Sequence, residues 1–277
     1  IEGDIRNRDL LKKTLKDVDC VIHLACISND PSFELNPKLG KSINLDSFKP
    51  LVELSEKSAV KRFIYASSSS VYGVKNSQDV TEDMELEPLT DYSLFKAKCE
   101  RILLSFSSSS FETVIVRPAT ICGVSRRQRL DVVVNILTNL AFHKGLITVL
   151  GGDQLRPNLH IDDMVDAYME ILNAPKNLIH QEIFNVGFEN ISVMNLAKIV
   201  QRVVNPKVKI IKEPTVDSRS YHISAKKIER ILGFTPKKKI EDAVLDLKIA
   251  FKNRIFERPL DNEYYFNITR MKSYKLE

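Results

Sequence analysis

The chain has 277 residues, of which 43% are hydrophobic and 28% are charged. This balance is typical of a globular protein with a sizeable core, and the small, dispersed net charge of +5 argues against a nucleic-acid partner. No apolar run approaches the roughly 20 residues that cross a bilayer, and no signal-peptide pattern opens the sequence, so we expect no membrane partner and a cytoplasmic location.

Predicted strands and helices alternate along the first half of the chain. Residues 18–26 form an apolar run, with His23 expected at the buried centre of a strand. Apolar residues then recur at helical spacing over residues 43–54, before a second strand at 62–67 and a third at 112–118. These strands are rich in β-branched and aromatic residues without alternation, as expected of parallel strands covered on both faces.

The second half is less regular, with a helical period over residues 161–172 and a fourth strand over 182–187. Ser192 and Ser224 are candidate helix N-caps, and Gly233 is a candidate left-handed C-cap. Four prolines punctuate this part, namely Pro157, Pro206, Pro214 and Pro236. We therefore expect an α/β fold in which a smaller lobe is built onto a mostly parallel sheet.

The cysteines and histidines give no sign of a metal site. Cys20, Cys26, Cys99 and Cys122 lack metal-binding spacing, and three of them lie in apolar runs. We therefore expect reduced thiols. The histidines are too scattered along the sequence to predict a shared ligand set, so no metal is expected.

One pair of residues on a predicted helix suggests acid/base catalysis. Tyr92 and Lys96 are four residues apart and would share a helix face, where an ammonium beside a phenol lowers the phenol pKa towards neutrality. This spacing alone occurs on many amphipathic helices. About 25 residues upstream, however, four serines at residues 67–70 end a predicted strand. Ligands collect at the carboxyl ends of parallel strands, so a serine can reach the same pocket.

Taken together, the stretches SSSSVYG, YSLFK and HLAC resemble the extended short-chain dehydrogenase/reductase family, specifically its nucleotide-sugar epimerases and dehydratases. The resemblance covers essentially the whole chain. It implies a Rossmann-like doubly wound parallel sheet, incomplete at its N-terminal end, and a smaller C-terminal substrate lobe. A partial dinucleotide-binding domain is expected over residues 1–123. The substrate-binding lobe is expected over residues 124–277, with about 158–190 returning to the sheet.

The resemblance also assigns roles to single residues. It implies catalysis by Ser68, Tyr92 and Lys96, with Ser67 towards the nicotinamide and with Ser69 and Ser70 shaping the turn. Cofactor contacts are implied for Asp4, Ile5, Leu24, Ala25, Cys26, Asn44, Ser67, Tyr92, Lys96 and Pro118. Substrate contacts are implied for Ser69, Thr120, Arg156, Asp217 and Arg219. The unusual basic stretch at residues 126–135 is expected to lie over the sugar nucleotide, with contacts from Arg129 and Asn135, and the alternative is a salt-bridged surface helix. The cofactor would be NAD, with NADP not excluded, the substrate a nucleotide-diphosphate sugar, and a homodimer possible.

The sequence departs from the family pattern at several places. It lacks the glycine-rich turn and the following acidic residue of a dinucleotide-binding unit, so we expect a fragment from which about 60 residues are missing. Thr120 and Cys122 stand where asparagine and tyrosine are usual. Ser69 and Ser70 replace the Asp-Glu pair of the dehydratases, and hydroxyls do not perform that carboxylate chemistry at neutral pH.

These patterns predict an NAD-dependent nucleotide-sugar epimerase that acts through a transient 4-keto sugar. Two alternatives stay open within the same family, a nucleotide-sugar oxidoreductase and a dehydratase. A third alternative is a non-catalytic nucleotide-binding protein that keeps the fold.

Overall fold

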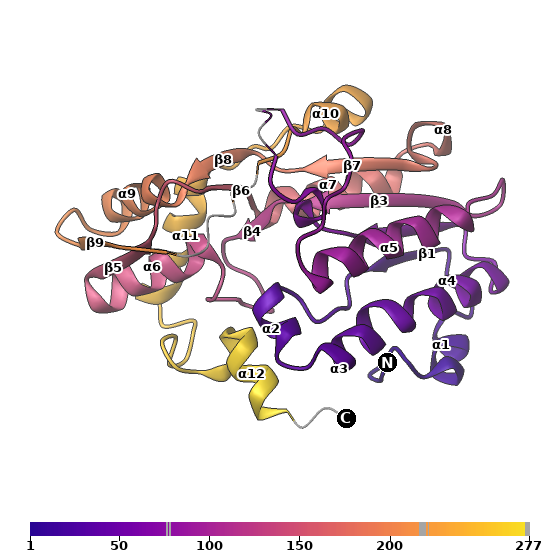
Figure 1. Ribbon diagram of the computed structural model, residues 1–277, viewed down its shortest axis with the longest axis horizontal. Coiled ribbons are helices and arrows are strands. Elements are labelled where there is room, and N and C mark those ends of the chain that lie inside the picture. The colour runs from indigo at the N-terminus through magenta and orange to yellow at the C-terminus, as the bar shows by residue number, and fades with distance from the viewer. Residues whose placement is uncertain (76, 78, 216–219, 221, 275–277) are drawn as a thin grey trace.

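The protein is described by a computed structural model that covers residues 1–75, 77, 79–215, 220 and 222–274. Its largest sheet has four parallel strands in the order β1-β2-β3-β7. The strands are β1 (Cys20–His23), β2 (Arg62–Ala66), β3 (Glu112–Pro118) and β7 (Glu182–Val186). Helices lie on both sides of this sheet, which is the doubly wound α/β arrangement that the sequence predicts (Figure 1).

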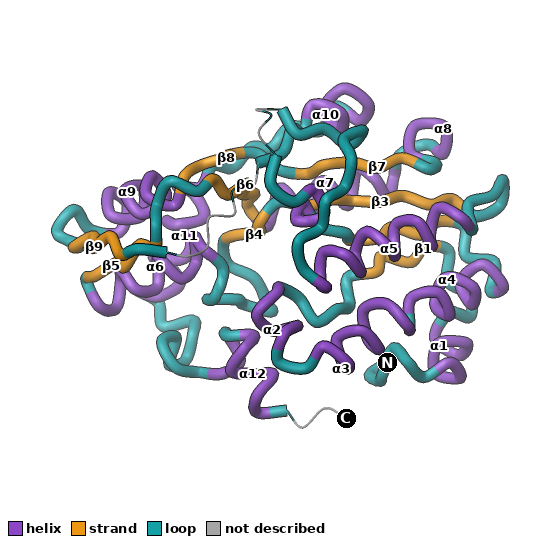
Figure 2. Tube along the Cα trace, in the orientation of Figure 1, coloured by secondary structure: helices purple, strands orange, loops and turns teal. Residues whose placement is uncertain are grey.

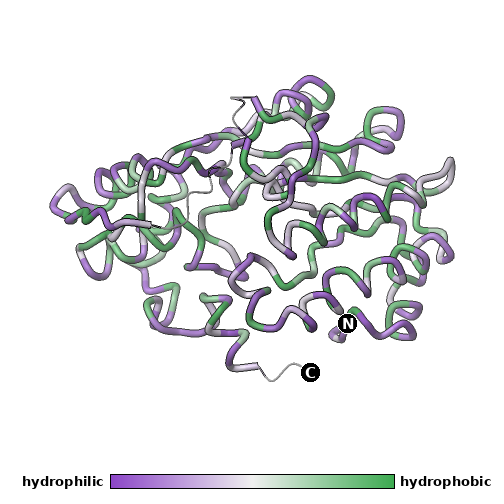
Figure 3. Tube along the Cα trace, in the orientation of Figure 1, coloured by the Kyte–Doolittle hydropathy of each residue, from purple (hydrophilic) through white to green (hydrophobic). Residues whose placement is uncertain are grey.

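Successive side chains of β2 divide between two cores, one on each face of the sheet. Phe63 and Tyr65 pack towards one face, and Ile64 packs towards the other. The first face is covered by α1 (Arg8–Thr14), α4 (Phe48–Lys57) and α5 (Asp91–Ser105), and the second by α7 (Ile161–Asn173), α8 (Lys176–Ile179) and α10 (Lys226–Leu232). Figure 3 shows hydrophobic stretches along the strands and alternating colours along the helices. Each large buried side chain contributes about 1.5–3 kcal/mol of hydrophobic free energy.

A second lobe forms around its own core at the other end of the molecule (Figure 2). Strand β5 (Leu146–Leu150) pairs in parallel with β9 (Lys209–Glu213). The helices α6 (Val133–Lys144), α9 (Val193–Val204) and α11 (Ile240–Lys252) pack around this pair. Between the two ends lies a third sheet of β4 (Thr120–Cys122), β6 (Leu155–His160) and β8 (Glu189–Ser192), in which β6 and β8 are antiparallel.

The C-terminal segment packs beside the segment that follows β1. Helix α12 (Asn267–Ser273) lies against α2 (Asp30–Glu34), which is followed by α3 (Pro37–Lys41) (Figure 1). Leu130 donates its backbone N–H to the carbonyl of Tyr265 over 2.9 Å. This contact ties the C-terminal segment to the loop that precedes α6.

The predicted strands agree with the structure to within one residue, except the first. Residues 18–26 are a strand only over Cys20–His23, because Leu24, Ala25 and Cys26 leave the sheet at its carboxyl edge. His23 is buried, as predicted. Residues 3–7, which hold the predicted cofactor contacts Asp4 and Ile5, form a turn. No strand lies beside it in the described chain, and the Asp4 carboxylate accepts from the backbone N–H of Arg6 at 2.8 Å.

The predicted helix ends are confirmed at two of three positions. Ser192 Oγ accepts from the N–H of Asn195 at 3.3 Å, and Gly233 has a left-handed φ of 69° after α10. Ser224 is wrong as an N-cap, because α10 begins one residue later, after Ala225. Its buried hydroxyl makes no hydrogen bond.

All four cysteines are unpaired in the structure. Within the described residues, every helix falls short of the length and apolar character that a bilayer crossing requires.

Candidate active site

The four-serine run turns sharply as it leaves β2. Ser68 caps a short 3-10 turn over Ser69–Tyr72, and its Oγ lies 2.8 Å from Ser70 Oγ. Gly73 ends this turn with a φ of 67°, and a Cβ there would meet the carbonyl oxygen of Glu87 at 2.1 Å. The glycine is therefore required for the turn that presents the serines.

The hydroxyl of Ser67 is engaged behind the end of the sheet, and the contact of this residue with the nicotinamide side stays a prediction. The side chain is buried, and its Oγ donates a short hydrogen bond to the Glu100 carboxylate behind the sheet end. Neighbouring side chains at the end of a strand point to opposite sides, so Ser67 turns inward when Ser68 faces the cavity.

Tyr92 and Lys96 lie in the first turns of α5, as their spacing predicts. Thr90 caps this helix in a capping box with Ser93, which fixes where the helix begins. Lys96 is buried and donates from Nζ to the carbonyl of Ala66 at 2.6 Å, directly before the serine run. Its Nζ is 5.8 Å from the centre of the Tyr92 ring.

The pKa of Tyr92 is raised in the structure, not lowered as the spacing argument predicts. Burial of the phenol is the main cause, and negative charge at Cys26 and Asp30 acts in the same direction. The positive charge of Arg129 and a side-chain hydrogen bond with Ser68 oppose this rise in pKa. The prediction failed because the spacing reports the neighbouring ammonium but not the desolvation of the phenol.

A cavity of about 480 Å³ opens at the carboxyl ends of β2 and β3. The hydroxyl-bearing residues Ser68, Tyr92 and Thr120 line it, together with Arg129 and Arg156. Ser67, Ser69 and Pro118 also line it. Most of the predicted substrate residues thus meet in one place, although they come from segments far apart in the sequence.

Two predicted contact residues have structural roles instead. Asn135 is buried and holds the backbone of Gly123 and Arg129, with its Nδ2 donating to the Arg129 carbonyl at 2.7 Å. Asn44 is likewise buried, and its amide pairs with the backbone N–H and carbonyl of Ile27 at 2.8 and 2.9 Å. Each fixes a loop at the site, and neither lines the cavity.

Three further predicted residues do not line this cavity. Asp4 pairs with Arg6 at 2.6 Å, and Ile5 packs on the core beneath α4. Ala25 is exposed in the loop after β1. Asp217 and Arg219 lie outside the described residues.

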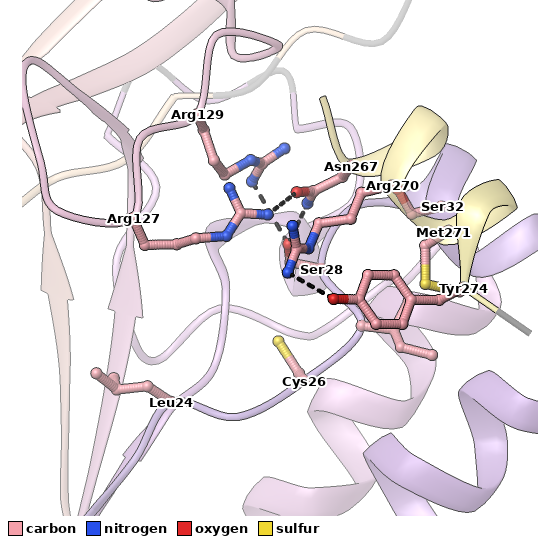
Figure 4. Close-up of a pocket in the computed structure, with 11 residues that line it drawn as sticks. Leu24, Cys26, Ser28, Ser32, Arg127, Arg129, Asn267, Arg270, Met271 and Tyr274 are labelled. Carbon is pink, nitrogen blue, oxygen red and sulfur yellow. Dashed lines mark hydrogen bonds between the residues drawn. The ribbon is translucent and has the colours of Figure 1, made fainter. Parts of the chain in front are cut away.

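A second pocket, of about 470 Å³, adjoins the first and shares Ser28 and Arg129 with it. Leu24 and Cys26, which the resemblance assigns to the cofactor, line this pocket. Figure 4 shows α12 closing its other side with Arg270 and Tyr274. Sequence reasoning missed this contribution, because nothing in the C-terminal stretch matches a motif and only the fold brings it back to β1.

A buried polar network lies behind the cavity. The guanidinium of Arg117 pairs with Glu100 at 2.7 Å, with both side chains 3% exposed. It also donates to the hydroxyl of Tyr72 at 2.7 Å, which in turn donates to Asn185 at 2.7 Å. These bonds join β3, α5, the serine turn and β7 to one another.

A cluster of His160, Asp162 and Asp246 offers three possible metal ligands. His160 Nδ1 accepts from the N–H of Asp162 at 3.1 Å, so Nε2 carries the proton and faces Asp246 at 3.3 Å. The ammonium of Lys238 pairs with both carboxylates, at 2.6 and 3.7 Å. The contacts describe a salt-bridged surface cluster whose cation is Lys238.

Residues 1–187 match the sequence model of the family described as NAD dependent epimerase/dehydratase. The UDP-glucose 4-epimerase of Lactobacillus helveticus is 24% identical over 266 residues, covering 88% of this chain and 80% of that protein. The dTDP-D-glucose 4,6-dehydratase of Bos taurus is 28% identical over 229 residues, covering 79% of this chain and 59% of that protein.

Solved structures show the same fold. The crystal structure of UDP-glucuronic acid 4-epimerase from Bacillus cereus, in complex with UDP-glucuronic acid and NAD, superposes with a TM-score of 0.81. It is 26% identical, and the match covers 91% of this chain and 81% of that one.

Proposed function

Because this chain belongs to the NAD dependent epimerase/dehydratase family, we propose that it is an NAD-dependent nucleotide-sugar epimerase that works through a transient 4-keto sugar. One observation carries the proposal. A single cavity brings together the hydroxyls of Ser68 and Tyr92, while Lys96 lies buried behind them. Hydroxyls, not carboxylates, occupy the two positions that follow Ser68.

In the proposed reaction, Tyr92 accepts the proton of the sugar C4 hydroxyl and Ser68 donates a hydrogen bond to the C4 oxygen as it becomes a carbonyl. NAD supplies, when bound, a reversible acceptor for the C4 hydride. The keto sugar turns over in the cavity and regains hydrogen on its opposite face. Tyr92 then returns the proton to the C4 oxygen. Lys96 and Arg129 stabilise the phenolate, which burial disfavours.

The residues at the carboxyl end of β1 fit a nicotinamide cofactor. Leu24 is 58% exposed although it is apolar, and Cys26 lies in the same pocket. An exposed apolar surface in this pocket suits a planar ring, and ligands of open parallel sheets bind at this edge. Leu24, Cys26, Lys96 and Tyr92 are the residues that we propose to contact it. NADP is to be tested alongside NAD.

The cavity favours epimerisation over dehydration. Loss of water from a 4-keto sugar needs a free acid and a free base beside C5 and C6. The carboxylates that line the cavity, Asp30 and Asp131, are both engaged. Asp30 accepts from the Thr90 hydroxyl at 2.5 Å, and Asp131 accepts from Arg129 at 2.8 Å.

The substrate is proposed to be a UDP-sugar, held at its diphosphate by Arg156 and Arg129. Both arginines line the cavity, and a guanidinium binds phosphate oxygens in a two-pronged manner. The names of the similar epimerases point to UDP-glucose and UDP-glucuronic acid as the first substrates to test.

The deciding experiment follows the C4 hydrogen of a deuterated UDP-sugar with added NAD. An epimerase keeps the label at C4 and leaves the nicotinamide absorbance unchanged overall. Net NADH formation would favour the oxidoreductase alternative, and a 4-keto-6-deoxy product would favour the dehydratase. No turnover, together with retained binding, would favour the non-catalytic alternative.

Tyr92→Phe tests the proton transfer directly. Removing the acid/base hydroxyl is expected to lower kcat by about 10²- to 10⁴-fold with little change in the melting temperature. Tyr168→Phe, which removes the hydroxyl of a half-buried tyrosine on α7 outside both site pockets, is the matched control. A Tyr92→Phe variant with near-normal kcat would remove Tyr92 from this role.

The assembly and location are proposed on narrower grounds. Leu45, Pro50 and Ile102 form the apolar part of a groove between α4 and α5, and we propose that a second copy of the chain covers it. Light scattering would test for the dimer mass.

Four unpaired cysteines suit a reducing compartment, so we place the reaction in the cytoplasm.

A further inference from the structure

The pocket beneath α12 gathers three arginines. Arg127 and Arg129 reach it from the loop before α6, and Arg270 reaches it from α12 (Figure 4). Asn267 and Ser28 lie between them, with Asn267 Nδ2 donating to Ser28 Oγ at 2.8 Å. No acidic residue of the described chain lines this pocket.

The positive charge in this pocket is poorly balanced. Arg129 pairs with Asp131, but Arg127 donates only to neutral acceptors, the carbonyls of Gln128 and Tyr264 and the side chain of Asn267. Within the described residues, neither Arg127 nor Arg270 forms an ion pair. The pKa of Arg127 is lowered by desolvation and then by the positive charges of Arg270 and Arg129.

Arg270 carries the clearest sign of a missing partner. Its guanidinium is held between the rings of Tyr264 and Tyr274, 3.8 and 4.9 Å from their centres. Nη2 donates to the Tyr274 hydroxyl at 3.2 Å, whereas Nη1 is buried and makes no hydrogen bond with the described chain. A charged donor that is positioned, desolvated and unpaired costs free energy until an acceptor arrives.

From this arrangement we infer that the pocket is a phosphate-binding site, in which Arg270 and Arg129 bind the oxygens of a phosphoryl or diphosphoryl group. The guanidinium groups approach from two different segments, and Ser28 and Asn267 add neutral polar groups. A tetrahedral anion with several oxygens can use donors from several directions, whereas a planar carboxylate uses fewer.

The site is argued from its own side chains and does not require the epimerase reaction. Only the source of the phosphate rests on the proposed function, since both a nicotinamide dinucleotide and a nucleotide sugar carry a diphosphate. The pocket adjoins the catalytic cavity through Ser28 and Arg129, so either diphosphate is within reach of it.

The test is a calorimetric titration of the full chain with inorganic pyrophosphate at low ionic strength. The wild type is expected to bind it, and Arg270→Gln to raise the Kd by about tenfold or more, the usual scale for losing one charged hydrogen-bonding partner. Arg230→Gln, which removes the same charge from an exposed position on α10, is the matched control and should bind as the wild type does.

Unchanged pyrophosphate binding in Arg270→Gln, or no binding by the wild type, would overturn the proposal. Acetate that binds as tightly as pyrophosphate would overturn the phosphate assignment. Titrations with NAD and with UDP then identify the source. The ligand whose Kd rises in Arg270→Gln carries the bound diphosphate, and if neither Kd rises the source is free phosphate.

A second measurement guards against a variant that fails to fold. The guanidinium nitrogen resonances of the wild-type protein are followed by NMR as pyrophosphate is added. A saturable shift of the Arg270 signal supports the site, and a static Arg270 signal contradicts it. A failed epimerase assay would leave this result unaffected, so the two proposals fail separately.

Discussion

At the scale of single residues, two adjacent serines take different roles. Ser67 turns inward to Glu100, and Ser68 faces the cavity beside Tyr92. Both carry the same hydroxyl, so their roles follow from strand geometry, which sends neighbouring side chains to opposite sides. Both residues line the cavity, but the hydroxyl of Ser67 is already bonded to Glu100.

Ser68→Ala is expected to lower kcat by about 10²- to 10³-fold, the usual loss when one donor to a developing oxyanion is removed. Kinetics with a UDP-sugar provide the measurement. Ser110→Ala, in the exposed loop before β3, is the control and should keep full activity. Equal rates for the two variants would contradict the placement of Ser68 at C4.

His23 makes a pH-dependent contribution to stability. It is 7% exposed and packs on Phe48, Phe63 and Tyr65, and burial lowers its pKa from 6.5 to about 3. Between these values the unfolded chain binds a proton that the folded chain excludes. The free energy of unfolding should therefore fall by about 1.4 kcal/mol per pH unit as the pH drops below 6.5.

The variant His23→Phe keeps an aromatic ring in this cluster and cannot be protonated. Urea denaturation at pH 7, 6 and 5 should show a shallower loss of stability for His23→Phe than for the wild type. Parallel pH profiles for the two proteins would show that His23 is not the source of the dependence.

At the scale of secondary-structure elements, Glu100 connects the pieces that form the site. It lies about one turn after Lys96 on α5, accepts from Ser67 after β2 and pairs with Arg117 on β3. These three elements, which are distant in the sequence, are thereby held in fixed positions relative to one another. Few buried charges in the described chain are so completely paired.

Glu100→Gln is expected to destabilise the protein by about 3–5 kcal/mol, because Arg117 then keeps a buried charge without its counterion. Asp19→Asn, which breaks the exposed Lys61 pair, should cost less than about 1 kcal/mol and is the matched control. Urea denaturation measures both values. If Glu100→Gln lowers the free energy of unfolding no more than Asp19→Asn does, water that enters the network must compensate Arg117 for the lost counterion.

At the scale of the whole molecule, the main sheet depends on the second half of the chain. Its outer strand is β7, and the core on one face contains Met164, Phe184, Ile223 and Ile228. Residues beyond 190 thus complete a domain that the sequence places within residues 1–123 and about 158–190. The second half of the chain therefore contributes to the cores of both lobes.

A fragment of residues 1–123 is therefore expected not to fold cooperatively. Without β7, α7 and α10, one face of β2 and β3 would lie open to water. Circular dichroism during urea denaturation should show no sigmoidal transition for the fragment, in contrast to the full chain. A cooperative transition in the fragment would show that the first half is an independent domain.

The sequence by itself determined the strand and helix pattern, the family resemblance and the positions of Ser68, Tyr92 and Lys96. These features depend on local periodicity and on short motifs, so neighbouring residues are enough to define them. Tertiary structure alone decided that the pKa of Tyr92 rises, that Ser67 and Asn135 form hydrogen bonds with Glu100 and with loop backbone, and that α12 carries Arg270 to the pocket lined by Leu24 and Cys26. Burial, hydrogen-bond partners and long-range contacts arise from segments that meet only in the folded chain, so no local pattern encodes them.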